Sequence, residues 1–77
     1  MKVECKYFGQ VAEVTKLKSE WVEIEGNLEQ LDELIKMKYP SLHFVNYQFA
    51  VNQKIAELNS ELNKADKIAL LPPFGGG

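Results

Sequence analysis

Hydrophobic and polar residues alternate at the start of the chain. Between Lys2 and Phe8, Val3, Cys5 and Tyr7 occupy one parity, and charged residues occupy the other. A period of two is typical of a strand that buries one face. The pattern therefore predicts a half-buried strand with Cys5 on its core face. Phe8 falls on the polar parity, which makes it a candidate contact residue.

The next segment connects this strand to a second one. Residues 9–19 are too long for a tight hairpin, and their valine spacing predicts a helical turn within the connection. Alternation returns at residues 20–25, where Val22 and Ile24 are predicted to face inward. Gly26 ends this second strand.

A helix is predicted to begin after Asn27. The Asn27 side chain can accept hydrogen bonds from the first turn, and Gln30 stands where a capping box needs its return acceptor. Pro40 predicts the end of the helix, because proline disfavours helical backbone at Tyr39. The predicted apolar face comprises Leu28, Leu31, Leu34 and Ile35, and the predicted polar face comprises Glu29, Asp32, Glu33 and Lys36.

The rest of the chain predicts a connector, a hairpin and a final strand. Residues 42–47 indicate an irregular or short helical connector, and residues 48–56 a strand, a turn at Asn52-Gln53 and a short strand. Residues 57–65 are polar, and residues 67–71 alternate as a strand. The residues predicted to anchor these segments in the core are Phe49, Val51, Leu58, Leu62, Ile68 and Leu70.

These elements, in a chain of 77 residues, predict an α+β fold with one main helix packed across a mixed sheet. Right-handed crossovers favour parallel pairing of the first and last strands. That arrangement is the β-grasp, or ubiquitin-like, fold. We expect residues 1–72 to form the domain, with a central last strand, and residues 73–77 to form a flexible glycine-rich tail.

Composition excludes several classes of function. The net charge is -2 and the chain has no arginine, which argues against nucleic acid as the main partner. No apolar run approaches the roughly 20 residues of a membrane span, and charges occupy the place of a signal peptide's apolar stretch. We therefore expect no membrane partner and a cytoplasmic location.

The chain also offers little chemistry of its own. One cysteine, Cys5, excludes an internal disulfide, and with a single histidine, His43, it cannot build a metal site. His43 is interpreted as a connector residue, and no Ser-His-Asp, paired-carboxylate or phosphate-loop pattern is present. We expect no bound cofactor, no metal and no catalytic turnover by the isolated chain.

The last residues, "LLPPFGGG", are the exception. Pro72 and Pro73 resist helix and sheet pairing and favour an extended path away from the domain. Three glycines, which have no Cβ, suit a segment that must enter a narrow slot in a partner protein. The reactive group would be the α-carboxylate of Gly77, ionised above a pKa of about 3.5 and unreactive until it is activated as an acyl-adenylate. The alternative interpretation is a frayed end without function.

Nearly the whole chain resembles the small, sulfur-carrying subunit of molybdopterin synthase. The similar segments are "KYFGQVAEV", "AVNQ" and "IALLPPFGGG", and the double proline before terminal glycines is the most specific motif. The resemblance implies that an adenylating partner related to ubiquitin-activating enzymes uses ATP to convert Gly77 to a thiocarboxylate. It further implies that the tail enters the large synthase subunit, in a heterotetramer, and donates sulfur to cyclic pyranopterin monophosphate.

By the same resemblance, Gly77 carries the sulfur and Gly76 is the slim residue behind it. The family's hydrophobic docking patch corresponds to Phe8, Ile55 and Leu71. Parity had already placed two of these, Phe8 and Leu71, off the core face. The tail residues expected to contact the partner are Pro72, Pro73, Phe74 and Gly75.

The sequence departs from the family pattern at three places. Ala65-Asp66 replaces the usual Asp-Gly turn before the last strand. Phe74 follows the double proline where a smaller aliphatic residue is usual, and Gly75 is additional. These last two changes concern the fit of the tail in its channel.

Three other interpretations stay open. A sulfur carrier for thiamine thiazole synthesis shares the terminal chemistry but generally lacks the double proline. A carrier for another acceptor, or a protein-conjugating modifier, would also use the tail. A ubiquitin-like interaction module would have an inert terminus.

Six acidic residues between Glu20 and Glu33 are interpreted as a solvated face, or else as a surface that steers a basic partner.

Overall fold

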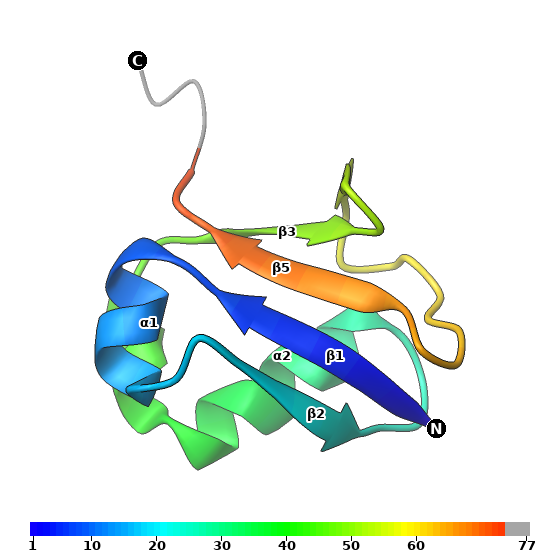
Figure 1. Ribbon diagram of the computed structural model, residues 1–77, viewed down its shortest axis with the longest axis horizontal. Coiled ribbons are helices and arrows are strands. Elements are labelled where there is room, and N and C mark those ends of the chain that lie inside the picture. The colour runs from blue at the N-terminus through cyan, green and yellow to red at the C-terminus, as the bar shows by residue number, and fades with distance from the viewer. Residues whose placement is uncertain (74–77) are drawn as a thin grey trace.

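The computed structural model describes residues 1–73. These residues form five strands, two α-helices and one 3-10 helix (Figure 1). In chain order these are β1 (Lys2–Tyr7), α1 (Gly9–Thr15), β2 (Ser19–Glu23), α2 (Leu28–Lys38), η1 (Pro40–Phe44), β3 (Gln48–Val51), β4 (Lys54–Ala56) and β5 (Lys67–Leu71).

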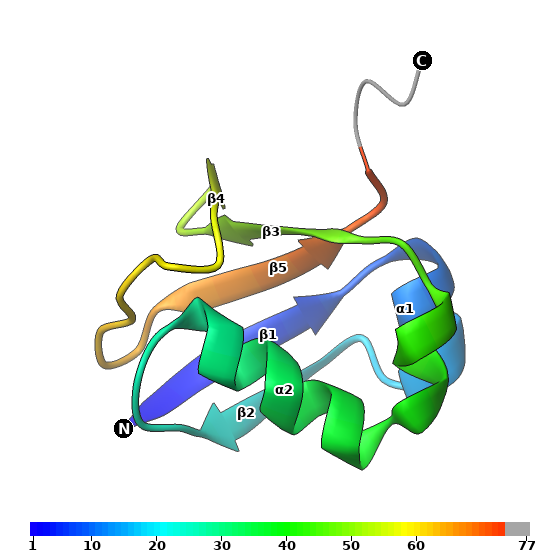
Figure 2. The same ribbon diagram turned by 180° about the vertical axis from the view of Figure 1, so that it is seen from behind.

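The five strands form one mixed sheet in the order β2-β1-β5-β3-β4. β1 and β5 run parallel, and every other neighbouring pair is antiparallel. Figure 2 shows α2 lying across one face of this sheet. The predicted β-grasp fold, the parallel pairing of the first and last strands and the central position of β5 are all confirmed. Residues 74–77 of the expected tail lie outside the described residues.

The core lies between α2 and the covered face of the sheet. Cys5 on β1 and Ile68 on β5 are paired neighbours, and both are fully buried. The parity predicted for these two strands is therefore confirmed. The other fully buried side chains are Val3, Val11, Leu28, Leu31, Ile35, Leu42 and Leu70.

The start of α2 confirms the predicted capping box. The Asn27 side chain accepts from the backbone N–H of Gln30, and the Gln30 side chain accepts from the backbone N–H of Asn27 at 2.8 Å. Gly26 has a φ of +113°, and a Cβ there would lie 1.6 Å from Oε1 of Gln30. Glycine at this position therefore allows the capping box to form. The helix ends at Lys38, just before Tyr39-Pro40, as predicted.

Two predictions about side-chain burial are wrong. Leu58 was expected to anchor its segment but is 43% exposed, and Leu62 alone provides that anchor. Asp32 was expected on the solvent face of the helix but is buried. It is covered because the Tyr47 hydroxyl donates to its carboxylate and the Lys36 amino group lies 3.2 Å away.

The turn before β5 shows how the chain manages without the usual glycine. Ala65 adopts a φ of +67°, in the left-handed region that glycine occupies at less cost. The neighbouring Asp66 carboxylate accepts from Asn52 at 2.9 Å and from the backbone N–H of Asn63 at 2.7 Å. The Asn52 side chain in turn accepts from the backbone N–H of Lys67 at 3.0 Å. These bonds tie the β3–β4 turn to the start of β5.

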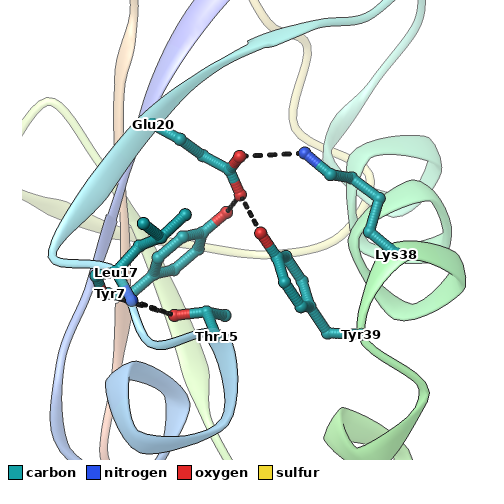
Figure 3. A network of polar contacts seen from close by, with 6 residues as sticks. All are labelled: Tyr7, Thr15, Leu17, Glu20, Lys38 and Tyr39. Carbon is teal, nitrogen blue, oxygen red and sulfur yellow. Dashed lines mark hydrogen bonds and ion pairs between the residues drawn. The ribbon is translucent and has the colours of Figure 1, made fainter.

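A second polar network fixes the end of α2 to β2 (Figure 3). The Glu20 carboxylate accepts from the hydroxyls of Tyr7 and Tyr39 and from the Lys38 amino group, the last two at 2.9 Å. Burial by itself would raise the pKa of Glu20. The hydrogen bonds from Tyr7, Lys38 and Tyr39 together outweigh burial, so the pKa lies below its ordinary value. The folded state therefore favours the ionised carboxylate.

This network predicts an acid-dependent loss of stability. Glu20→Gln should lower the free energy of unfolding at neutral pH by about 2 kcal/mol, since it weakens charge-assisted hydrogen bonds. The difference between the two proteins should be full above the ordinary carboxyl pKa of 4.5 and disappear as pH falls through the lowered folded pKa. Urea unfolding over this pH range measures it. Glu13→Gln, at an exposed position of α1, is the matched control; a Glu20→Gln deficit that persists unchanged in acid would contradict the account.

Candidate functional site

The last strand delivers the chain to one end of the sheet. β5 lies between β1 and β3 and ends at Leu71, which pairs with Gln48 of β3. Pro72 and Pro73 follow and are both exposed. Figure 1 shows the short coloured segment after β5, residues 72–73, turning away from the strands. The exit of the tail is therefore built on the centre of the sheet.

The three residues of the predicted docking patch lie together on the open face of the sheet, opposite α2. Phe8 is 44% exposed, Ile55 is 58% exposed and Leu71 is half-buried. They line one shallow hollow of about 540 Å³. The full lining is Lys6, Phe8, Ala50, Gln53, Ile55, Lys67, Ile68, Ala69 and Leu71. We call this surface the sheet patch.

Sequence reasoning missed the floor of the sheet patch. Ala50 and Ala69 face one another across β3 and β5, and their small side chains leave the hollow between larger neighbours. Both occupy the off-core parity of their strands, which is the signal that could have identified them. Lys6 and Lys67 add positive charge to the lining. The patch thus offers an apolar surface with cationic groups, suited to a partner of apolar and acidic character.

Cys5 is not available for sulfur chemistry in the folded protein. Its side chain is fully buried, and burial, followed by the nearby charge of Glu20, raises its pKa to about 12. A thiol that is both inaccessible and protonated neither attacks a substrate nor accepts a persulfide. The prediction that Cys5 is a core residue is confirmed.

Metal-ligating side chains do not cluster among residues 1–73. Within that range, no group of three or more histidine, cysteine, aspartate or glutamate side chains could hold a metal ion. His43 is exposed on η1, the connector in which it was predicted. No helix of the described residues is long and apolar enough to cross a membrane.

The acidic segment is less available than a solvated face would be. Glu20 and Asp32 are held in the two internal networks, so the interpretation as a solvated face is wrong for them. Glu23 and Glu25 lie 2.7 and 2.8 Å from the amino group of Met1. Glu29 and Glu33 are exposed on α2. Internal networks thus engage Glu20 and Asp32, while the other four carboxylates are exposed, as the solvated-face interpretation predicts.

The chain belongs to the ThiS family. The family model matches residues 5–77, which include the tail. The human molybdopterin synthase sulfur carrier subunit is 36% identical, over 99% of this chain and 94% of the relative. The subunit of the same name from Mycobacterium tuberculosis is 37% identical, over 100% of this chain and 99% of the relative. The resemblance stated from the sequence is therefore confirmed.

Solved structures support the same fold. A putative molybdopterin converting factor subunit 1 from Pyrococcus furiosus has a TM-score of 0.87 at 23% identity, over 94% of this chain and 97% of that one. Small archaeal modifier protein 1 from Haloferax volcanii has a TM-score of 0.82 at 23% identity, with the same coverage. At such identity, both show the fold alone. A chain from the complex of subunits 1 and 2 of the Helicobacter pylori molybdopterin-converting factor has a TM-score of 0.74 at 28% identity, over the full length of both chains.

The predicted tail contacts divide between described and undescribed residues. Leu71, Pro72 and Pro73 stand at the exit, next to the sheet patch. Phe74, Gly75, Gly76 and Gly77 lie outside the described residues, so the structure does not test their roles. Whether the sheet patch binds a partner also stays a prediction.

A charge placed in the sheet patch should weaken partner binding. Phe8→Asp should raise the Kd for a docked partner at least about thirtyfold, because aromatic anchors at interface centres contribute about 2 kcal/mol or more. Leu71→Asp should act in the same direction. Titration of the large synthase subunit from the same genome, followed by calorimetry, measures the effect.

Phe44→Asp provides the matched control for Phe8→Asp. Phe44 is 93% exposed on η1, away from the sheet patch, so the same substitution should leave Kd unchanged. Equal affinities for wild type, Phe8→Asp and Leu71→Asp would remove the sheet patch as a docking surface.

Proposed function

We propose that this protein is the sulfur carrier subunit of a molybdopterin synthase and that Gly77 carries the sulfur as a thiocarboxylate. Two full-length relatives at 36% and 37% identity bear that subunit's name. The observation that carries the proposal is structural: the sheet patch ends at Leu71, the residue before the Pro72-Pro73 spacer. A partner bound at the patch would lie beside the point from which the tail departs.

The proposed chemistry takes place on the α-carboxylate of Gly77, as the C-terminal group of the working protein. A carboxylate oxygen attacks the α-phosphate of ATP and releases pyrophosphate, which leaves an acyl-adenylate. A sulfur nucleophile at the oxidation level of sulfide then displaces AMP and leaves the thiocarboxylate. An unactivated carboxylate is too poor an electrophile for direct exchange, so activation is required.

The proposal assigns two partners to the chain. An adenylating enzyme related to ubiquitin-activating enzymes supplies ATP-dependent activation in the cytoplasm. The large synthase subunit then receives the tail, in a heterotetramer, and sulfur passes to cyclic pyranopterin monophosphate. The solved complex of subunits 1 and 2 from Helicobacter pylori supports the pairing with a large subunit. The isolated chain has no turnover in this scheme and binds no cofactor.

The separate roles proposed for this chain and for its partners agree with the residues that the structure describes. Cys5, the chain's one thiol, is buried and protonated, so a cysteine persulfide is not an alternative carrier. The fold keeps the domain compact while its central strand leads to the reactive end. The partners supply the catalytic groups, and this chain supplies recognition and a terminal acyl group.

Intact-mass measurement tests the proposed function. After incubation with the adenylating enzyme, ATP and a sulfide source, the protein should gain the mass difference between sulfur and oxygen. Fragmentation must place that gain on Gly77, because oxidation of Met1 or Met37 adds nearly the same mass. Omission of ATP should prevent the gain. An unchanged terminal fragment under full conditions would contradict the proposal.

A further inference from the structure

The first residue of the spacer is held from two sides. On one side, the Gln48 side chain donates a hydrogen bond from Nε2 to the backbone oxygen of Pro72, at 3.1 Å. On the other side, Gly9 lies against the proline ring, with a φ of +55°. A Cβ at Gly9 would lie 3.1 Å from Cγ of Pro72. The two contacts come from β3 and from the first residue of α1, which follows β1.

The contact from Gln48 lies one residue beyond the last backbone pair of the sheet. Gln48 and Leu71 are the terminal pair of the β3–β5 ladder. The ladder stops there because Pro72 and Pro73 have no N–H to donate. The Gln48 side chain reaches one residue further and binds the carbonyl oxygen of Pro72. The strand is thus extended by one side-chain bond beyond its last backbone pair.

That bond acts on the softest torsion of the spacer. The pyrrolidine rings fix φ of Pro72 and Pro73, and the peptide between them is planar. The following proline confines ψ of Pro72 to a broad extended region. Rotation about ψ moves the carbonyl oxygen, so a hydrogen bond to that oxygen selects one value within the region. Gln48 therefore restrains the direction in which Pro73 and the following residues depart.

A small change at this point affects the start of the tail. Residues 73–77 can span at most about 17 Å when extended. A rotation of a few tens of degrees at Pro72 would redirect Pro73, and with it the point from which that span begins. Restraint before binding lowers the entropy lost when the tail enters a partner.

We infer that Gln48 is a positioning residue for sulfur transfer, which directs the tail by holding the Pro72 carbonyl, with Gly9 as the opposing support. The inference rests on the proposed function, because it needs a partner that receives the tail. It concerns the exit of the tail and not the sheet patch. Loss of the Gln48 side-chain donor should therefore affect only the part of partner binding that depends on the tail.

A double-mutant cycle separates these contributions. The protein in its carboxylate form is titrated against the large synthase subunit from the same genome, as the full chain and as a chain that ends at Pro73. Gln48→Met keeps the side-chain length and removes the donor. In the full chain it should raise Kd about fivefold, the equilibrium equivalent of one net hydrogen bond. In the shortened chain it should have no effect.

Two further variants complete the design. Gln48→Lys retains an N–H donor of sufficient reach and should restore most of the affinity. Asn59→Leu makes a similar amide-to-apolar change at an exposed position between β4 and β5, where Asn59 lines a hollow with Met1 and Leu62 rather than with Pro72, so it should leave Kd unchanged. Thermal unfolding of every variant checks that the domain is intact.

The outcomes distinguish this inference from the proposed function. If the full wild-type chain binds more tightly than the shortened chain, the tail contributes as proposed. Gln48→Met must then act in the full chain alone; an equal effect in both lengths, or none in either, overturns the inference. If wild type gains no sulfur on Gly77 and its affinity does not depend on the tail, these two results contradict the proposed function itself, whatever Gln48→Met does.

Discussion

The parallel pairing of β1 and β5 is the interaction on which the rest of the structure depends. It joins the first and last strands in the middle of the sheet, where Cys5 and Ile68 lie side by side without solvent contact. Burial of side chains such as Ile68 and Leu70 stabilises the fold by roughly 1.5–3 kcal/mol each. A strand held on both sides cannot shift register without moving its whole set of side chains to the wrong face. The point at which the chain leaves the sheet is therefore fixed by the core itself.

This arrangement places the surface proposed to bind a partner next to the base of the tail. Leu71 contributes to the sheet patch, and the next residue begins the spacer, so a docked partner lies at the base of the tail. Pro72 and Pro73 cannot continue the sheet, because they have no N–H groups to donate. Their fixed φ favours one direction for the backbone that leaves it. The Gln48 side chain and the close approach of Gly9 add restraint at the first of them. A small domain whose one thiol is buried can in this way serve a reaction carried out by larger partners.

Much of the fold follows from residue order alone. Alternation along β1 and β5 and the capping box at Asn27 determine the strand faces and the start of α2. Burial of Asp32 does not follow from helical periodicity, since it depends on Tyr47, a residue far along the chain that reaches its carboxylate. The exposure of Leu58 likewise depends on how the segment after β4 crosses the molecule. Local patterns specify which residues can be buried, and tertiary contacts decide which of them are.

The candidate site was predictable to a similar degree. Phe8 and Leu71 can be recognised in the sequence, because they are apolar residues at positions that face away from the core. Ile55 was predicted only from the family resemblance. The roles of Ala50, Ala69 and Gln48 can be recognised only once the strand order is known. Ala50 and Ala69 face one another across β3 and β5, and Gln48 of β3 binds Pro72, which follows β5. The tail motif itself is visible in the sequence, since prolines and glycines restrict or free the backbone whatever surrounds them.

The central claim is that the domain and the reactive end are separable, and removal of Gly76 and Gly77 tests it most directly. The shortened protein should keep the wild-type midpoint of thermal unfolding and its ability to bind the large subunit through the sheet patch. Molybdopterin formation in the reconstituted synthase should fall to background. Sulfur transfer that survives this truncation in a folded protein would contradict the account.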